Sequence, residues 1–377
     1  MSDFLATRRD FLKTAGTTLA AATLTTQLTP STLAAEGSDQ PFGYAVVGIG
    51  GLTKNSILPA FAGMKHARLT GLVSGDLEKA RETGAKYGVP ESGLYTYETF
   101  DKIVENPAIH AVYIVLPNSM HAEYTIRAFK AGKHVLVEKP MAISAKECEA
   151  MIAAGKEANK LLSVGYRLRY EPYNREMIRM VQEKELGNAR VILTESGFNI
   201  GNPEQWRLSK ELAGGGSMMD IGIYALNAAR YLAGEEPVEV VAFETTDHSD
   251  PRFKDVENTV TFQMRFPSGV LASCVSSYGT PLNRYRVHAE RGSFELEPAL
   301  SYGGIKMRVF AHGKTEPREF PAVNHFGAMM DDLAVCAATG KTPITDGVDG
   351  LNDLRVIEAV YESMKSGQPV KLAQAEK

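Results

Sequence analysis

Side chains capable of proton chemistry occur in two short motifs. Residues 138–140 read Glu-Lys-Pro directly after an apolar run, and Asp220 and Tyr224 follow the glycines of residues 214–216 in a predicted helix. Residues four apart share one face of a helix. A phenol is a poor base at neutral pH because its usual pKa is about 10, but an adjacent ammonium group makes it a usable proton acceptor or donor. The motifs therefore predict a proton-transfer site in which Lys139 acts beside Tyr224.

Each motif also has an ordinary structural explanation. Glu138 and Lys139 would serve as a salt bridge at the end of a strand, and Tyr224 would be a core residue. Asp220 would be favoured in the first turn of its helix by the helix dipole. In the catalytic interpretation, Asp220 either holds a substrate hydroxyl or aligns the lysine.

A glycine-rich loop between an apolar strand and a helix predicts a dinucleotide cofactor. Residues 43–47 form the strand, and the loop consists of Gly48, Ile49, Gly50, Gly51 and Leu52. Glycine at such a position lets the backbone approach a pyrophosphate at a helix N-terminus. The third position of the usual fingerprint is Thr53 and not Gly or Ala, so the match is partial, and the alternative is a tight turn.

The end of the second predicted strand favours NADP over NAD. NAD-type sites place a carboxylate there to bind the ribose 2′-hydroxyl, whereas this strand ends at Ser74. Ser74 would bind a 2′-phosphate, and Lys79 would neutralise it. Asp76 is the contrary observation, because it could accept a hydrogen bond from a free 2′-hydroxyl.

Alternating strands and helices in the first half of the chain position these groups. The predicted strands are 43–47, 67–73, 111–116 and 134–137, and the predicted helices are 57–64, 77–87, 122–131 and 145–159. This alternation is typical of a doubly wound parallel sheet, the Rossmann fold.

The pattern changes after Gly165. The predicted strands are 190–198, 238–246, 258–266, 270–278, 284–289 and 306–311, followed by helices after His325 and over 351–366. Polar and apolar residues alternate in several of them, which indicates a large, open, mostly antiparallel sheet with one solvated face. We therefore expect an α/β chain with a dinucleotide-binding domain over 36–163 and an α+β domain for substrate binding and oligomerisation over 164–377.

The first 35 residues predict a twin-arginine signal peptide. Arg8 and Arg9 precede Phe-Leu-Lys, a short apolar stretch over 14–28 and the small residues of 31–35, in the order typical of such signals. We therefore expect export of the folded chain to the periplasm. Because soluble nicotinamide cofactor is not supplied there, the protein is expected to hold its NADP tightly and to regenerate it.

Composition excludes several other classes of protein. The formal net charge is −4, and the charged and hydrophobic fractions are 23% and 44%, which are ordinary for a globular protein. The sequence contains no basic patch of the kind that binds nucleic acid, and after the signal peptide it contains no long apolar run that would anchor it in a membrane. The three cysteines lack metal-site spacing, so we expect no metal and buried structural thiols.

From about Phe42 onward, the sequence resembles the glucose–fructose oxidoreductase and inositol dehydrogenase family. The segments that carry the resemblance are 44–50, 116–122, 138–140, 165–167, 205–208 and 213–224. Family members in general have histidine where Tyr224 stands, and the branch that acts on pairs of sugars has tyrosine.

The resemblance implies roles for individual residues. It makes Lys139 the catalytic lysine, Tyr224 the proton carrier and Asp220 a substrate-orienting group. The implied cofactor contacts beyond the glycine loop, Ser74 and Lys79 are Leu116, Asn118, His121, Glu138, Lys139, Arg167, Trp206 and Arg207. The implied sugar site consists of Lys139, Arg167, Asp220, Tyr224 and Tyr278.

The resemblance also implies a reaction. An aldose is oxidised to its aldonolactone, and the hydride passes to a second sugar, either fructose or another aldose, at the same site in a ping-pong sequence. The alternatives are an NAD(P)-dependent sugar or inositol dehydrogenase that uses free cofactor, and a non-catalytic sugar- or NADP-binding protein. The connector of residues 36–42 is too short to form the long arm with which the glucose–fructose branch of this family contacts neighbouring subunits in tetramers, so we expect a homodimer through the C-terminal sheet.

Overall fold

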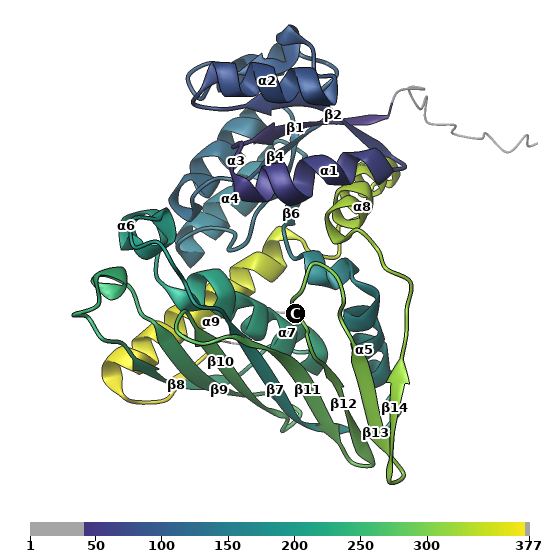
Figure 1. The fold of residues 1–377 in the computed structure, drawn as a ribbon, viewed down its shortest axis with the longest axis vertical. Coiled ribbons are helices and arrows are strands. Elements are labelled where there is room, and N and C mark those ends of the chain that lie inside the picture. The colour runs from purple at the N-terminus through teal and green to yellow at the C-terminus, as the bar shows by residue number, and fades with distance from the viewer. Residues whose placement is uncertain (1–40, 374–377) are drawn as a thin grey trace, which may run out of the picture. The chain divides into compact units, whose positions relative to one another are not determined.

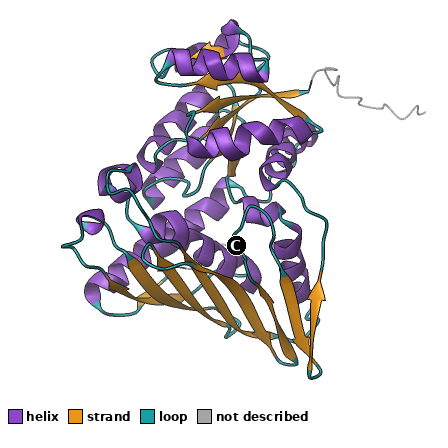
Figure 2. Cartoon of the chain, viewed as in Figure 1, coloured by secondary structure: helices purple, strands orange, loops and turns teal. Residues whose placement is uncertain are grey.

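The structure is a computed structural model that describes residues 41–373. The predicted signal peptide lies outside the described residues. Two β-sheets and the helices around them make up the described chain (Figures 1 and 2). The first sheet is parallel and the second is mostly antiparallel, which confirms the fold class predicted from the sequence.

The first sheet has six parallel strands in the order β3-β2-β1-β4-β5-β6. Its strands are β1 (Phe42–Val47), β2 (Ala67–Val73), β3 (Leu94–Tyr95), β4 (Ala111–Ile114), β5 (His134–Val137) and β6 (Leu162–Val164). All of β4 is buried, as its continuous apolar sequence requires. The strand order reverses between β1 and β4, and ligands of such sheets bind beyond the carboxyl ends of the strands at this point.

Helices cover both faces of the first sheet. They are α1 (Leu58–Ala60), α2 (Leu77–Tyr87), α3 (His121–Lys130), α4 (Ala145–Glu157) and, from much later in the chain, α8 (His325–Thr339). The predicted helix over 57–64 is instead a π turn from Thr53, the short α1 and a 3-10 turn that ends at Gly63. Pro59 lies inside this continuous helical run and has no backbone N–H to donate, which interrupts the regular α-helical pattern.

The second sheet has nine strands in the order β14-β13-β12-β11-β7-β10-β9-β8-β15. They are β7 (Ala189–Gly197), β8 (Glu239–Thr245), β9 (Thr259–Arg265), β10 (Leu271–Ser277), β11 (Leu282–Ala289), β12 (Gly292–Leu296), β13 (Met307–Ala311), β14 (Lys314–Arg318) and β15 (Val370–Lys371). Among the described strands of this second sheet, β10 and β7 pair in parallel and all other neighbours are antiparallel.

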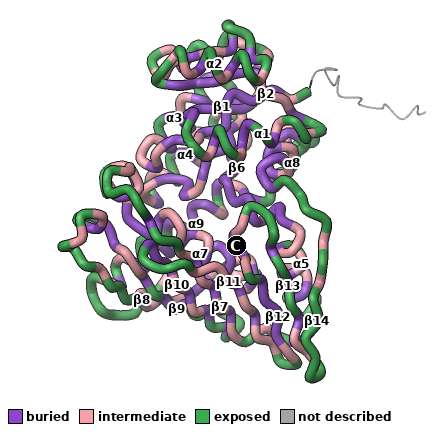
Figure 3. The backbone as a smooth tube through the Cα atoms, in the orientation of Figure 1, coloured by how far each residue is buried: buried purple, intermediate pink, exposed green. Residues whose placement is uncertain are grey.

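Helices cover one face of the second sheet and leave the other open (Figure 1). The covering helices are α5 (Pro172–Gln182), α7 (Ile223–Ala233) and α9 (Gly347–Ser366), and the short α6 (Lys210–Ala213) lies near the first sheet. Along β9 every second side chain is buried, and the side chains between them are exposed or half-exposed (Figure 3). The sheet therefore has the one solvated face that the alternating sequence predicted.

The three cysteines are free and buried, as expected. None of the helices between residues 41 and 373 is long and apolar enough to cross a membrane. Within the same residues, no group of His, Cys, Asp and Glu side chains could hold a metal ion.

Candidate active site

The glycine loop lies directly after β1, at the carboxyl edge of the first sheet. Gly48 has φ +94°, a conformation that favours glycine, and a Cβ on it would lie 2.3 Å from the Val115 carbonyl oxygen. Only glycine therefore fits where the loop passes the end of β4. A Cβ on Gly50 or Gly51 would meet nothing within 4 Å. These two glycines leave an open cradle in front of the backbone, so the loop fits the close approach of a pyrophosphate.

Thr53 explains the departure from the usual glycine fingerprint. Its side chain is fully buried, and its hydroxyl donates a hydrogen bond of 2.6 Å to the Gly48 carbonyl oxygen. Thr53 therefore closes the loop on itself, and a glycine is not needed at this position.

The residues after β2 form a helix start. Ser74 is buried, and its Oγ accepts a hydrogen bond of 3.1 Å from the Asp76 backbone N–H. Asp76 caps α2 by accepting from the Lys79 backbone N–H at 3.1 Å. Because N-capping accounts for the aspartate, its presence does not require a free 2′-hydroxyl as partner. The Lys79 side chain is half-exposed at the same edge.

Lys139 and Asp220 form a buried ion pair. Lys139 follows β5, and its Nζ donates to the Asp220 backbone carbonyl at 2.6 Å and to Asp220 Oδ1 at 3.3 Å. The two side chains are only 11% and 13% exposed. The other carboxylate oxygen, Oδ2, accepts from the Tyr278 hydroxyl at 3.0 Å and pairs with Arg207 Nε at 3.2 Å. Both carboxylate oxygens of Asp220 thus have partners within the protein. These contacts favour a role in aligning Lys139 over a direct hydrogen bond to a substrate hydroxyl.

Both partners of this pair are charged at neutral pH. Burial raises the pKa of Asp220, but Lys139 and then Arg207 outweigh it, so the pKa lies below its usual range. Burial lowers the pKa of Lys139, but the Asp220 carboxylate outweighs it, so the pKa lies above its usual range. Lys139 is therefore a fixed cation and not a proton acceptor.

Tyr224 receives this cation on the face of its ring. Lys139 Nζ lies 4.8 Å from the ring centroid, and the Arg167 guanidinium lies 5.4 Å from it. The Tyr285 hydroxyl fixes the start of α7 by donating to the Tyr224 carbonyl oxygen at 2.9 Å. Among the described residues, no group hydrogen-bonds to the Tyr224 hydroxyl, and the side chain is half-buried. The phenol is therefore available to a substrate.

The helix that carries these residues is not α-helical at its start. Met218–Gly222 form a π turn, and α7 begins only at Ile223. Single π turns occur frequently at functional sites. The predicted α-helical face shared by Asp220 and Tyr224 is thus replaced by a wider turn, which still brings both residues to Lys139.

Three residues predicted to contact ligands have side chains that other parts of the protein hold. His121 and Tyr278 have 0% exposure. The His121 ring nitrogens bond the carbonyls of Pro140 at 2.8 Å and Leu116 at 3.0 Å, and Tyr278 bonds Asp220. Arg167 is 4% exposed and donates to the Leu300 carbonyl. Their contact with a ligand stays a prediction, and the partners that hold them could not be inferred from spacing in the sequence.

Other predicted cofactor residues lie at the same edge with their side chains engaged. Glu138 accepts from the Tyr113 hydroxyl at 2.6 Å, and burial raises its pKa. Asn118 Nδ2 donates to the Ala213 carbonyl at 2.8 Å. Leu116 is buried, and the Arg207 guanidinium lies 4.6 Å from the Trp206 ring. Their contact with a cofactor stays a prediction.

Sequence reasoning missed Tyr302. This residue lies between β12 and β13, is 62% exposed, and has the Arg167 guanidinium 4.3 Å from its ring centroid. No motif surrounds it, and the chain crosses most of the second sheet between the glycine-rich motif of residues 213–224 and this residue. Tertiary structure alone brings it to the site.

The fold and the site together define a class of protein. A Rossmann sheet with an open glycine cradle, and a lysine and a phenol at its carboxyl edge, are the parts of a nicotinamide-dependent oxidoreductase. Residues 42–166 match the family model described as "Oxidoreductase family, NAD-binding Rossmann fold", and residues 174–295 match the "GFO/IDH/MocA C-terminal domain". The chain belongs to this GFO/IDH/MocA oxidoreductase family, as its motifs predicted.

Known proteins of the family align over nearly the whole chain. The crystal structure of aldose-aldose oxidoreductase from Caulobacter crescentus, complexed with glycerol, is 52% identical with a TM-score of 0.87, and the match covers 88% of this chain and 100% of that one. D-xylose 1-dehydrogenase [NADP(+)] of Haloarcula marismortui is 32% identical over 89% of this chain and 94% of its own length. The scyllo-inositol 2-dehydrogenase (NAD(+)) of Bacillus subtilis is 27% identical over 78% of this chain and 85% of its own length.

Proposed function

We propose that the protein oxidises an aldose to its aldonolactone and passes the hydride to a second sugar, with NADP held tightly throughout. The observation that carries the proposal is the buried Lys139 ammonium against the ring of Tyr224, whose hydroxyl is open to a substrate. The similarity to an aldose-aldose oxidoreductase at 52% identity supports it. When bound, the cofactor supplies the hydride acceptor of one half-reaction and the hydride donor of the other.

The proposed proton chemistry uses Tyr224 in both directions. In the oxidative half-reaction the phenolate form of Tyr224 takes the proton of the anomeric hydroxyl, and in the reductive half-reaction the resulting phenol returns this proton to the oxygen of the acceptor carbonyl. The Lys139 ammonium offsets the negative charge of the phenolate. Asp220 fixes the lysine, with Arg207 and Tyr278 holding its second oxygen.

We propose an aldose as the second sugar, which the reaction reduces to an alditol. The activity named for the Caulobacter relative supports this choice over fructose. Because one phenol serves both half-reactions, donor and acceptor bind in turn, and ping-pong kinetics are expected.

NADP is the proposed cofactor because of the residues that follow β2. The Ser74 hydroxyl, which accepts one hydrogen bond and still has its proton to donate, and the half-exposed Lys79 are the proposed partners of a 2′-phosphate, whereas Asp76 is occupied as the cap of α2. The NADP(+) dependence named for the xylose dehydrogenase relative supports the same choice.

Export to the periplasm by the twin-arginine pathway is the proposed location. The sequence of residues 1–35 supports it. A cofactor that stays bound is then part of the proposal, since it must enter with the folded chain.

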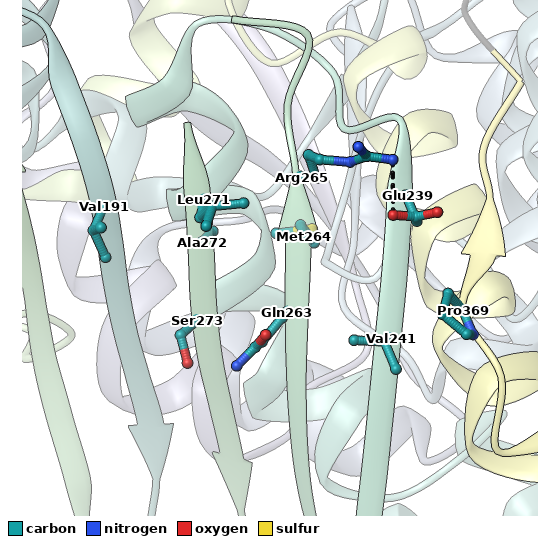
Figure 4. A pocket seen from close by; sticks show the side chains of 10 residues that line it. All are labelled: Val191, Glu239, Val241, Gln263, Met264, Arg265, Leu271, Ala272, Ser273 and Pro369. Carbon is teal, nitrogen blue, oxygen red and sulfur yellow. Dashed lines mark ion pairs between the residues drawn. The ribbon is translucent and has the colours of Figure 1, made fainter. Parts of the chain in front are cut away.

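A homodimer through the open face of the second sheet is the proposed assembly. Phe243 and Leu271 project from this face with 64% and 51% exposure. A shallow pocket of about 310 Å³ lies among the neighbouring strands, with the Arg265–Glu239 ion pair at one end (Figure 4). Exposed apolar surface on a sheet is typical of a protein–protein contact.

The second candidate function is a sugar dehydrogenase that uses free NADP, which the similarity to D-xylose 1-dehydrogenase favours. One experiment separates the two. The purified protein is dialysed, an aldose is added with no cofactor, and the absorbance of reduced nicotinamide is recorded. We expect the band to appear at one equivalent per chain and to vanish on addition of a second aldose. Turnover that requires added NADP would support the dehydrogenase.

A further inference from the structure

A buried carboxylate outside the proton-transfer site holds the segment from which that site is built. We propose that Glu257 and Tyr361 are positioning residues that fix the π turn carrying Asp220, and through it the place of the Lys139 ammonium. The inference rests on the proposed function, because it assigns these residues a role in that reaction.

Glu257 accepts three hydrogen bonds at the start of the π turn. It lies just before β9 and is 7% exposed. Its Oε2 accepts from the Gly216 backbone N–H at 2.8 Å, and its Oε1 accepts from the Met218 backbone N–H at 2.9 Å and from the Tyr361 hydroxyl at 3.0 Å. A carboxylate at the N-terminal end of a helical segment is electrostatically favourable, and it satisfies backbone donors that would otherwise be unpaired.

Hydrogen bonds continue from this carboxylate to the lysine. The Asp220 backbone N–H donates to the Gly216 carbonyl oxygen at 3.2 Å, and the Asp220 carbonyl oxygen accepts from Lys139 Nζ at 2.6 Å. Hydrogen bonds therefore connect the Tyr361 hydroxyl on α9, through Glu257, Gly216 and Asp220, to the Lys139 ammonium. Two hydrogen bonds transmit a shift of Gly216 to the lysine.

The glycines before the π turn are explained by the same contacts. A Cβ on Gly215 would lie 2.0 Å from the Tyr361 hydroxyl oxygen, and a Cβ on Gly216 would lie 2.2 Å from the Glu257 carbonyl oxygen. The second contact is with backbone, which cannot rotate away. Glycine is required at both positions because Glu257 and Tyr361 approach the loop so closely.

The test is Tyr361→Phe, which removes one hydroxyl and keeps the ring. We measure the single-turnover rate at which an aldose reduces the bound cofactor, together with the KM of the aldose and the cofactor content. A misplaced catalytic group costs rate far more than binding, up to about 100-fold for a shift of about 1 Å. The expected result is a rate lower by about tenfold or more, with the KM and cofactor content near those of the wild type.

Tyr44→Phe is the matched control. Tyr44 is fully buried in β1, and its hydroxyl donates to the Met330 carbonyl oxygen at 2.8 Å, remote in the chain from the groups that hold Asp220. This variant is expected to lose a comparable amount of stability and to keep the wild-type rate. Glu257→Gln is the second test variant, because its amide would present N–H groups to the donors of Gly216 or Met218, and its rate should fall below that of Tyr361→Phe.

Each outcome is decisive for the positioning role. Unchanged rates in Tyr361→Phe and in folded Glu257→Gln, beside an active wild type, would overturn it. A rise in KM with no fall in rate would overturn it as well. Wild-type protein whose bound cofactor no aldose reduces would instead contradict the proposed function, and the positioning role would fall with it.

Discussion

Lys139 contacts Tyr224 through the face of the ring, not through the hydroxyl. The ammonium lies 4.8 Å from the ring centroid, and the Asp220 carbonyl oxygen holds it at 2.6 Å. The cation therefore acts on the phenol through space, while the hydroxyl remains available to the sugar. This arrangement suits a residue that must release and recover a proton in successive half-reactions.

Tyr224→Phe tests the proton-carrier role at this scale. Both half-reactions should slow by about 100- to 10,000-fold, the usual contribution of general acid–base catalysis. The cofactor should remain bound, because the ring and the stacked cations are retained. Single-turnover absorbance of the bound nicotinamide measures the rate of each half-reaction, and rates within about tenfold of the wild type would remove Tyr224 from the mechanism.

His121 predicts a dependence of stability on pH. Burial lowers its pKa from 6.5 to about 4, so the folded protein binds the ring proton less readily than the unfolded chain does. The stabilisation by the neutral ring is complete above pH 6.5 and is lost as the pH falls from 6.5 towards about 4. Its size is on the order of 3 kcal/mol.

Urea unfolding of the wild type and of His121→Gln between pH 7 and 5 measures this contribution. The wild type should lose stability over this interval more steeply than the variant. Some slope should remain in the variant, because burial also lowers the pKa values of His134 and His325 to about 4. Equal slopes in the two proteins would show that His121 does not contribute.

At the scale of elements, two glycines of the loop after β1 are expected to have different roles, one in folding and one in cofactor binding. A Cβ on Gly48 would collide with the Val115 carbonyl oxygen, whereas a Cβ on Gly50 would project into open space. Gly48→Ala should therefore destabilise the fold, by about 1–3 kcal/mol. Gly50→Ala should leave the unfolding free energy within about 0.5 kcal/mol of the wild type and lower the cofactor content after dialysis. Full cofactor retention by Gly50→Ala would contradict the cradle.

Elements with a strong local signal were predicted, and those without one were not. The buried strands β4 and β5 have continuous apolar sequences, and α2 ends at Gly88 in the left-handed conformation. Helix α5 was missed although Glu171 caps it and Pro172 occupies its first turn, a start signal that the sequence does contain. The exposed, charged β14 has no apolar alternation from which to infer a strand.

The site was predicted where motifs define it and missed where packing does. Lys139, Asp220 and Tyr224 come together as expected, because each belongs to a recognisable motif. The full burial of His121 and Tyr278 was not predicted, because burial of a side chain depends on distant segments. Glu257 and Tyr302 lie in segments that carry no motif and reach the site only in the folded chain.

At the scale of the whole molecule, the open face of the second sheet is the proposed dimer contact. Phe243→Glu places a charge at an apolar position of this face, and burying an unpaired charge opposes association. We expect the mass measured by light scattering to fall from that of a dimer to that of a monomer. Val104→Glu is the control, because Val104 is 57% exposed on the first domain. A wild type that is monomeric, or a variant that remains dimeric, would contradict this contact.

The central claim is that hydride moves from one sugar to another without free cofactor. The most direct measurement supplies the dialysed protein with an aldose deuterated at C1, an unlabelled second aldose and no added nicotinamide. We predict deuterium at C1 of the alditol product, at close to one atom per molecule of aldonolactone formed. An alditol without deuterium, or no alditol until NADP is added, would contradict the account.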